Sequence, residues 1–297
     1  MCVIVSRMTA PDSGRQHMRS QRTHYVTTTD GVTIGGTVHG EGPPLVFLQG
    51  VIGDGDIDWG ATAGHLTDNF TCHLPSLRGR GLSSDHPDLS TPRIIEDCLT
   101  YVESLDQPAG LVGWSGGGVW ALAVAARSEA VAAVAPFEPG MLSLADGSVQ
   151  AVIGDAVGRT AELAAEGNLS AAARAFAAFP FYDEEIALAD EAGYFDAAGR
   201  YVPSLLNLLQ QAMTQEGPVP DDPAVLGAIK TPVAILLGSD TKPFFTLSAR
   251  HVVDHVANAR VHEIPGAAHA GPLTHPEALA KALSDVFASS HEVQLQP

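Results

Sequence analysis

Cysteine and basic residues are scarce in this chain. Only three cysteines, Cys2, Cys72 and Cys98, occur in 297 residues, and their spacing fits neither a disulfide framework nor a zinc knuckle. We therefore expect a cytoplasmic protein in a reducing environment. The chain has 16 Lys and Arg against 34 Asp and Glu, which gives a net charge of −18. A surface of this charge repels phosphate backbones and anionic membranes, so we expect neither nucleic acid nor membrane as a partner.

Long apolar runs are also missing. No stretch approaches the roughly 20 residues that are needed to cross a bilayer. Residues 1–22 carry four arginines but no continuous apolar segment of the kind that a secretion signal requires, so we interpret them as a disordered leader. The remaining chain is long enough for one large core, since 45% of all residues are hydrophobic.

Strand and helix patterns alternate on both sides of a helix-rich block. Residues 23–138 and 224–290 contain short apolar runs typical of buried strands, most of them followed by helical segments. Residues 139–223, between them, are rich in Ala, Leu and Glu and contain several helical patterns. We therefore predict an α/β fold with a mostly parallel eight-stranded sheet flanked by helices. In this prediction residues 139–223 form an inserted helical lid, and residues 291–297 form a tail.

The expected elements can be given by residue range. We expect strands at 23–29, 32–38, 45–49, 70–74, 110–113, 131–137, 233–237 and 260–264. We expect core helices at 59–68, 91–105, 116–127, 246–257 and 276–288. The Asp-Gly pair at 30–31 is a typical hairpin turn, so the first two strands are expected to pair directly.

One serine lies at a sharp corner between an expected strand and an expected helix, in the segment Gly113-Trp114-Ser115-Gly116-Gly117. A serine on such a tight turn points its hydroxyl away from the sheet, and side chains at the flanking glycines would collide with the neighbouring strand and helix. The helix that follows directs its free N–H groups toward this corner. We predict that Ser115 is a nucleophile, that Gly116 supplies one oxyanion donor, and that Trp114 lies beside the site.

A serine hydroxyl needs a base to become a nucleophile. Among the 12 histidines, His269 is the best placed, because "PGAAHAGP" lies between the last expected strand and the last helix, at the same sheet edge as Ser115. His251 and His255 have the i, i+4 spacing of metal ligands, but neither an HExxH motif nor a nearby cysteine accompanies them. We therefore expect a solvated helix face there and no metal site.

Two carboxylates could orient the imidazole of His269. Asp240 follows the strand at 233–237 in "LLGSDTKP", and Glu138 follows the strand at 131–137 in "APFEPG". Both lie at the expected carboxyl edge of the sheet, and both keep the chain order serine, acid, histidine. We favour Asp240 and keep Glu138 as the alternative acid.

The second oxyanion donor is expected from the loop "LQGVIGDGDIDW", which follows the third strand. Gly50 permits close backbone approach, and the N–H of Val51 is the natural donor. The loop lacks the GxGxxG spacing of a phosphate-binding turn, and Asp54, Asp56 and Asp58 would repel a pyrophosphate. We therefore expect no nucleotide and no other cofactor.

Taken together, these motifs resemble the α/β-hydrolase superfamily over almost the whole chain from Tyr25 to about Ala288. The resemblance is carried by "GWSGG", "LQG", "LRGRG", "LLGSD" and "PGAAHAGP". Many relatives have His-Gly where this chain has Gln-Gly at 49–50. The resemblance implies that substrate binds between the core and a helical cap. The residues expected at this pocket are Gln49, Gly50, Trp114, Phe179, Phe181 and Tyr182.

The motifs and the resemblance imply a serine hydrolase that acts on a carboxylic ester or lactone of a small apolar substrate. An acyl-enzyme would form on Ser115, and water activated by His269 would release the acyl group. Serine at this position disfavours epoxide hydrolase and dehalogenase chemistry, which would need a carboxylate there. Two alternatives remain open: a cofactor-free oxygenase or perhydrolase, and a non-catalytic small-molecule binding module. A small molecule is the expected partner, and a monomer or homodimer the expected assembly.

Overall fold

The computed structural model describes residues 22–215 and 219–294. The strands are β1 (Arg22–Thr27), β2 (Thr33–His39), β3 (Pro44–Leu48), β4 (Thr71–Pro75), β5 (Ala109–Trp114), β6 (Val131–Phe137), β7 (Val233–Gly238) and β8 (Ala259–Ile264). The core helices are α1 (Gly55–Gly64), α2 (Thr91–Glu103), α3 (Gly116–Ala125), α9 (Pro223–Leu226), α10 (Pro243–His255), α11 (Gly271–Thr274) and α12 (Pro276–Gln294). The predicted leader falls on residues 1–21, outside the described residues, and on Arg22, which begins β1.

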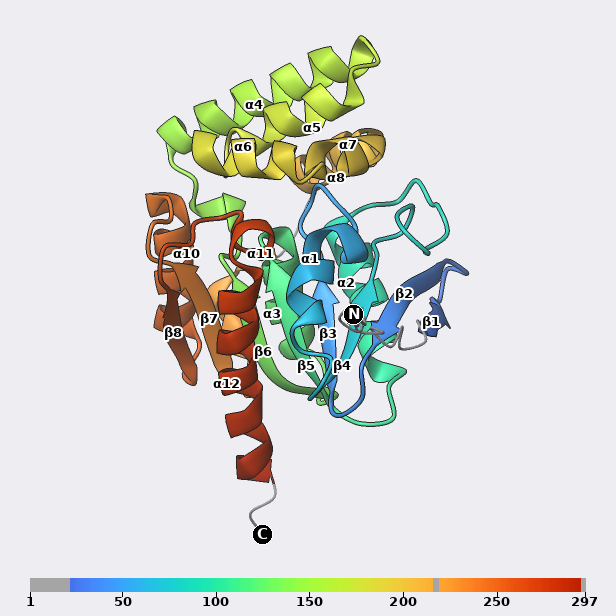
Figure 1. Cartoon of the computed structure of the whole chain (residues 1–297), viewed down its shortest axis with the longest axis vertical. Helices are drawn as coiled ribbons and strands as arrows, with labels where there is room; N and C mark the ends of the chain where they lie inside the picture. The colour runs from blue at the N-terminus through green and yellow to red at the C-terminus, as the bar shows by residue number, and fades with distance from the viewer. Residues whose placement is uncertain (1–21, 216–218, 295–297) are drawn as a thin grey trace, which may run out of the picture.

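The eight strands form one sheet in the order β1-β2-β4-β3-β5-β6-β7-β8. β2 pairs antiparallel with both β1 and β4, and all the later pairs are parallel. Helices α1 and α12 pack together on one face, and α2, α3, α9 and α10 follow one another on the other face (Figure 1). The predicted mostly parallel eight-stranded α/β fold is confirmed.

Burial explains why the strands differ in sequence. Every residue of β3 and β5 is buried, because helices cover both faces of these central strands, and their sequences are accordingly continuous apolar runs. At the edge of the sheet, β8 buries only Ile264. Across residues 22–215 and 219–294, no helix has both the length and the apolar character that a membrane span requires.

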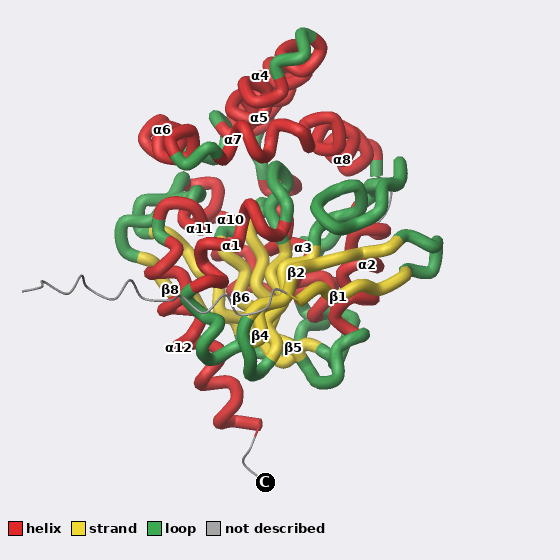
Figure 2. The backbone as a smooth tube through the Cα atoms, turned by 45° about the vertical axis from the view of Figure 1, so that its right-hand side comes forward, coloured by secondary structure: helices red, strands yellow, loops and turns green. Residues whose placement is uncertain are grey.

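A second group of helices lies between β6 and β7 in the chain. They are η1 (Leu142–Leu144), α4 (Gly147–Ala165), α5 (Leu169–Ala177), α6 (Asp183–Glu191), α7 (Tyr194–Ala198), η2 (Gly199–Tyr201) and α8 (Val202–Thr214). We call α4 to α8 the cap. Figures 1 and 2 show the cap stacked over one edge of the sheet. This edge is formed by the carboxyl ends of the parallel strands, since Trp114 at the end of β5 stacks on Phe181 of the cap with ring centroids 6.1 Å apart.

Two core helices differ most from their expected limits. α1 begins at Gly55 rather than at residue 59, because the side chain of Asp54 accepts a hydrogen bond from the N–H of Ile57 and caps the helix earlier. α12 continues to Gln294, past the expected end at residue 288. The expected tail at 291–297 is therefore helical as far as Gln294, and residues 295–297 lie outside the described residues.

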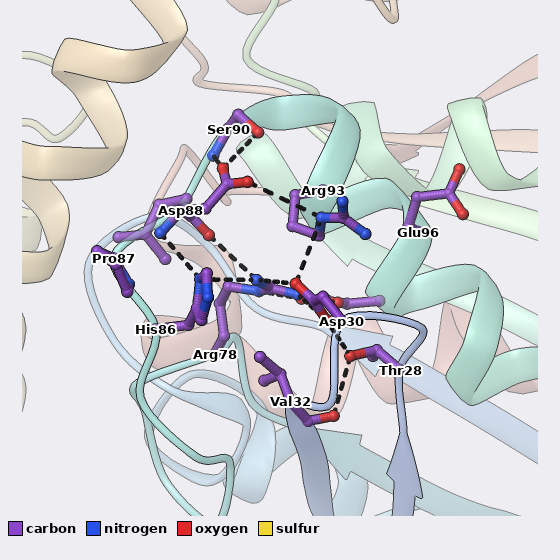
Figure 3. A network of polar contacts seen from close by, with 12 residues as sticks. Thr28, Asp30, Val32, Arg78, His86, Pro87, Asp88, Ser90, Arg93 and Glu96 are labelled. Atoms are coloured by element: carbon purple, nitrogen blue, oxygen red, sulfur yellow. Dashed lines mark hydrogen bonds and ion pairs between the residues drawn. The ribbon is translucent and has the colours of Figure 1, made fainter.

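The "LRGRG" segment fixes the loop that leads from β4 toward the cap. Arg78 is completely buried and donates to both carboxylate oxygens of Asp97, at 2.7 and 2.6 Å. The same guanidinium donates to Asp30 in the β1–β2 turn at 2.9 Å and to the carbonyl of Asp88 at 3.3 Å (Figure 3). The hydrogen bond from Arg78 holds the pKa of Asp30 well below its ordinary value. Arg78 thus joins the hairpin turn, α2 and the loop, and it fixes the segment that carries Arg80.

Candidate active site

The corner between β5 and α3 forces Ser115 into an unusual backbone conformation, with φ 55° and ψ −116°. Its N–H donates to the carbonyl of Phe137 at 3.1 Å. A Cβ added at Gly113 would lie 2.3 Å from the carbonyl oxygen of Gly117, and one added at Gly117 would lie 2.3 Å from the carbonyl oxygen of Gln49. Because neither position leaves space for a side chain, both glycines are required for the strand and the helix to meet at this angle.

His269 is paired with Glu138 in the interior. Nδ1 of His269 lies 2.9 Å from Oε2 of Glu138, and the two residues are 2% and 0% exposed. The other carboxylate oxygen of Glu138 accepts the N–H of Gly238 at 3.0 Å. Glu138 also has a left-handed backbone, with φ 44°, which a packed environment must hold in place. With Nδ1 engaged by the carboxylate, Nε2 is the imidazole nitrogen left to act as a base.

The structure contradicts the preference for Asp240 as the partner of His269. Asp240 is exposed, and its carboxylate accepts a hydrogen bond from the hydroxyl of Ser239 at 2.9 Å. Gly238 at the end of β7 packs so closely on the histidine loop that an added Cβ would lie 2.1 Å from the carbonyl oxygen of Ala267. The backbone N–H of Asp240 donates to this same carbonyl at 3.0 Å, but the side chain of Asp240 stays exposed, whereas that of Glu138 is completely buried.

Several contacts hold the histidine loop against the sheet. The ring of Phe245 stacks on the imidazole of His269, with centroids 3.8 Å apart. The indole N–H of Trp114 donates to the carbonyl of His269 at 2.8 Å. Glu185 of the cap accepts the N–H of Ala270 at 2.7 Å, and burial raises the pKa of this carboxyl group. The imidazole is therefore fixed in orientation by groups from the core and the cap alike.

Ser115 and His269 line the same pocket, whose empty volume is about 250 Å³ including the part that is open to solvent. The other lining residues are Gly50, Val51, Ile52, Trp114, Phe176, Pro180, Phe181 and Tyr194. Three of the predicted pocket residues are therefore present: Gly50, Trp114 and Phe181. The pocket is mostly apolar, and its walls come from both the core and the cap.

The other three predicted pocket residues lie elsewhere. The amide of Gln49 is buried, where it donates to the carbonyl of Gly53 and accepts the N–H of Leu77, so that it braces the loop after β3. Phe179 packs against Phe244 of α10 with ring centroids 5.7 Å apart. Tyr182 is 38% exposed and lies under the ammonium group of Lys242. The turn between α5 and α6 thus points some of its aromatic residues at the pocket and others at α10.

Sequence reasoning missed Ile52, Phe176, Pro180 and Tyr194. Tyr194 belongs to no motif, and no sequence signal distinguishes it from Tyr182. It reaches the pocket because α7 lies against α1 and the loop after β3, which is a contact between segments more than 130 residues apart in the chain.

The two residues that were predicted to supply oxyanion donors are neighbours of Ser115. Gly116 is the first residue of α3, where a helix leaves its N–H groups without intrahelical acceptors. Val51 is its neighbour, since a Cβ added at Gly116 would lie 2.7 Å from Cγ1 of Val51. In the described part of the chain, the N–H of Val51 has no hydrogen-bond acceptor. Both residues that were predicted to supply oxyanion donors therefore lie beside the serine corner.

Two buried charged residues lie behind the loop after β3. Burial raises the pKa of the Asp58 carboxyl group to about 7 and lowers the pKa of the Arg80 guanidinium to about 10. The sequence interpretation used Asp58 as an argument against phosphate binding. The structure places it in the interior, where it is 1% exposed.

The histidine pair on α10 shows no metal-binding arrangement. Nε2 of His251 lies 2.9 Å from the carbonyl oxygen of Asp221, and Nδ1 of His255 lies 2.8 Å from the carbonyl oxygen of His251. Among the residues that the structure describes, no group of three His, Cys, Asp or Glu side chains could hold a metal ion.

The sequence profile of the alpha/beta hydrolase family matches residues 38–282. This match covers most of the chain, and the fold agrees with it, so the chain belongs to the alpha/beta hydrolase family. Solved structures agree as well. An alpha/beta hydrolase from Sphaerobacter thermophilus superposes with a TM-score of 0.70 at 24% identity, over 89% of this chain and 100% of that one. The enol-lactonase from Burkholderia xenovorans gives 0.69 at 19% identity, again over 89% and 100%.

Two curated relatives are similar over a shorter stretch. Pyrrolizixenacetamide deacetylase of Xenorhabdus hominickii is 33% identical over 91 residues, which is 30% of this chain and 34% of that protein. Pimeloyl-[acyl-carrier protein] methyl ester esterase of Stenotrophomonas maltophilia is 35% identical over 98 residues, which is 33% and 36% of the two chains. The match thus spans about a third of the length of each relative.

Proposed function

We propose that this protein is a serine hydrolase that cleaves a carboxylic ester or lactone of a small apolar substrate through an acyl-enzyme. The observation that carries the proposal is the buried pair of His269 and Glu138 at the pocket that Ser115 lines. The hydroxyl of Ser115 attacks the substrate carbonyl while Nε2 of His269 takes its proton. Glu138 holds the imidazole in orientation and stabilises its charged form.

The negative charge that develops on the carbonyl oxygen is stabilised by the N–H groups of Val51 and Gly116. When the tetrahedral intermediate collapses, His269 returns the proton to the leaving alkoxide. A water molecule, deprotonated by the same imidazole, then attacks the acyl-enzyme, and the acid is released with Ser115 restored. Each step uses one base and one pair of donors, and both are fixed in place before substrate binds.

The pocket supports the choice of a small apolar substrate. Its walls are aromatic and aliphatic, which suits a small apolar acyl or alcohol group. One of the curated relatives is a methyl ester esterase, which supports an ester as the bond that is cleaved. We infer the ester bond from this relative together with the serine corner.

A panel of p-nitrophenyl esters from acetate to octanoate tests the proposal. Wild-type protein should hydrolyse the short esters, and Ser115→Ala should reduce kcat by about 10⁴-fold or more, because the nucleophile acts as a unit with its base. Ser239→Ala, at the same edge of the sheet but outside the pocket, is the matched control and should keep full activity.

A fluorophosphonate probe separates the alternatives. It should label the wild-type protein and leave Ser115→Ala unlabelled. A cofactor-free oxygenase driven by His269 would instead keep most of its own activity in Ser115→Ala. A wild-type protein that neither hydrolyses esters nor takes up the probe would be a binding module instead.

A further inference from the structure

A buried carboxylate lies between the loop that carries Val51 and the cap. Asp58 on α1 is 1% exposed. One of its oxygens accepts the N–H of Gly50 at 2.8 Å, and the other accepts the hydroxyl of Tyr194 at 3.0 Å. The loop wraps closely around this carboxylate, since a Cβ added at Gly53 would lie 2.0 Å from Oδ1. Asp58 therefore binds both the residue before the proposed oxyanion donor and a cap residue that lines the pocket.

Other side chains hold the same loop from the opposite side. The guanidinium of Arg80 donates from Nη1 to the carbonyl oxygens of Val51 and Gly53, both at 2.9 Å. Trp59, next to Asp58 on α1, donates its indole N–H to the carbonyl of Leu48 at 2.9 Å. The backbone on both sides of the Val51 N–H is thus fixed, and this sets the direction in which that N–H points.

The charge state of Asp58 decides whether its contacts persist. Burial is the main cause of its raised pKa, and the bonds from Gly50 and Tyr194 oppose the rise because they favour the ionised form. The other ionisable groups that act on it are Asp54, which raises the pKa further, and Arg80, which lowers it. An ionised carboxylate can accept both hydrogen bonds, whereas a protonated carboxyl group must give up part of this accepting capacity.

A second tyrosine–aspartate hydrogen bond joins the cap to the core, but its aspartate does not accept the N–H of Gly50 in the oxyanion loop. Tyr201 of the cap donates its hydroxyl to Asp54 at 2.7 Å. Asp54 caps α1 through the N–H of Ile57, and it makes no hydrogen bond to residues 50 or 51 in the described part of the chain. Only the pair of Tyr194 and Asp58 is linked to Gly50 of the oxyanion loop, whereas the hydroxyl of Tyr201 also accepts the N–H of Gly81 at 3.0 Å.

We infer that Asp58 is a positioning residue that orients the Val51 N–H through its hydrogen bond with Gly50. Through its hydrogen bond with Tyr194, this orientation depends on the position of the cap over the core. The inference rests on the proposed function, since it assigns a support to the proposed oxyanion hole. A closed cap places Tyr194 on the carboxylate and completes the set of contacts that hold the loop. The donor is then best aligned when the pocket is covered and water is excluded.

The test compares Tyr194→Phe with Tyr201→Phe, because each change removes one hydroxyl and leaves the ring. Tyr194→Phe should lower kcat by about 5- to 20-fold with KM changed less than about 2-fold, a fraction of the loss expected when an oxyanion donor is removed outright. Tyr201→Phe should keep kcat within about 2-fold of wild type. Inhibition by a trifluoromethyl ketone, whose adduct with Ser115 carries an oxyanion, should weaken in parallel with kcat in Tyr194→Phe alone.

Two substitutions of Asp58 extend the test. Asp58→Ala should lower kcat by about 100-fold, because misplacing a reacting group by about 1 Å has effects of this size. Asp58→Asn should recover most of this loss, because its amide oxygen can still accept from Gly50. Tyr194→Phe should also move the acidic limb of the kcat–pH profile to higher pH, since the lost hydroxyl had lowered the pKa of Asp58. Tyr201→Phe should leave that limb in place.

The inference is overturned if both tyrosine variants match wild type in kcat, in ketone inhibition and in pH profile while wild type hydrolyses esters. The proposed function would still stand in that case. If wild type shows no ester hydrolysis, or if Ser115→Ala retains it, the proposed function itself fails. Thermal melting identifies an Asp58→Ala variant that does not fold, and the two tyrosine variants then decide the question by themselves.

Discussion

The loops that follow β6 and β7 each bring an acidic residue to the same edge of the sheet, but the two residues differ in burial and in their partners. Glu138 comes directly after β6, is completely buried and contacts His269. Asp240 comes two residues after β7 and is exposed, and its carboxylate accepts a hydrogen bond from Ser239 of its own loop. A carboxylate becomes a fixed partner of an imidazole only where the backbone turns it inward, and the left-handed conformation of Glu138 does this.

The buried acid also occupies the place that the other acid would need. Glu138 reaches across from the end of β6 to accept the N–H of Gly238, the last residue of β7, while its second oxygen contacts His269. A carboxylate from residue 240 would have to displace it from both contacts. Only one carboxylate fits between Gly238 and His269, and Glu138 occupies this space because it directly follows β6.

The largest expected effect separates the two acids directly. Glu138→Gln should reduce kcat by about 10³- to 10⁴-fold, because the amide no longer stabilises the imidazolium or fixes its tautomer. Asp240→Asn should keep kcat within about 2-fold. Steady-state kinetics on a p-nitrophenyl ester measures both. A larger loss in Asp240→Asn than in Glu138→Gln would reverse the assignment.

A smaller loss of activity is expected when the side chain of Glu138 is shortened. Glu138→Asp shortens the side chain by one methylene, so that it should not contact both Gly238 and His269, and kcat should fall by about 10- to 100-fold. Combining Glu138→Gln with Asp240→Glu should not restore activity, because the longer side chain still begins on the exposed side of the histidine loop. Recovery in the double variant would show that the loop after β7 can supply the acid.

Stability should distinguish the loops as well. Glu138→Ala leaves the buried N–H of Gly238 without its acceptor, so the free energy of unfolding should fall by about 2 kcal/mol. Asp240→Ala should change it by less than about 0.5 kcal/mol, as expected at an exposed position. Urea denaturation monitored by tryptophan fluorescence gives both values. Equal losses in the two variants would contradict the difference in burial.

The smallest effect concerns the loop after β7 alone. The hydroxyl of Ser239 accepts the N–H of Gly266 at 2.8 Å in an exposed position. Ser239→Ala should therefore lower the free energy of unfolding by about 0.5 to 1 kcal/mol, while kcat stays unchanged. The same denaturation and ester assays check it, and a fall in kcat would show that this loop affects the chemistry after all.

Much of the core could be predicted because its signals are local. Continuous apolar runs marked the buried strands β3 and β5, and the glycines around Ser115 marked the corner between β5 and α3. The position of His269 followed from its place between the last strand and the last helix. The cap residues were harder to predict: Phe181 lines the pocket, whereas Phe179 and Tyr182 face elsewhere. Helical patterns give no direction relative to a distant sheet.

The sequence by itself determined the α/β architecture, the serine corner and the edge of the sheet where the site lies, because backbone sterics and hydrophobic periodicity act over a few residues. The tertiary structure alone decided that Glu138 rather than Asp240 contacts His269, and that Tyr194 and Asp58 meet beside the oxyanion loop. These contacts join residues about 100 or more positions apart, and only the packing of the whole chain determines which distant group fills a given buried space.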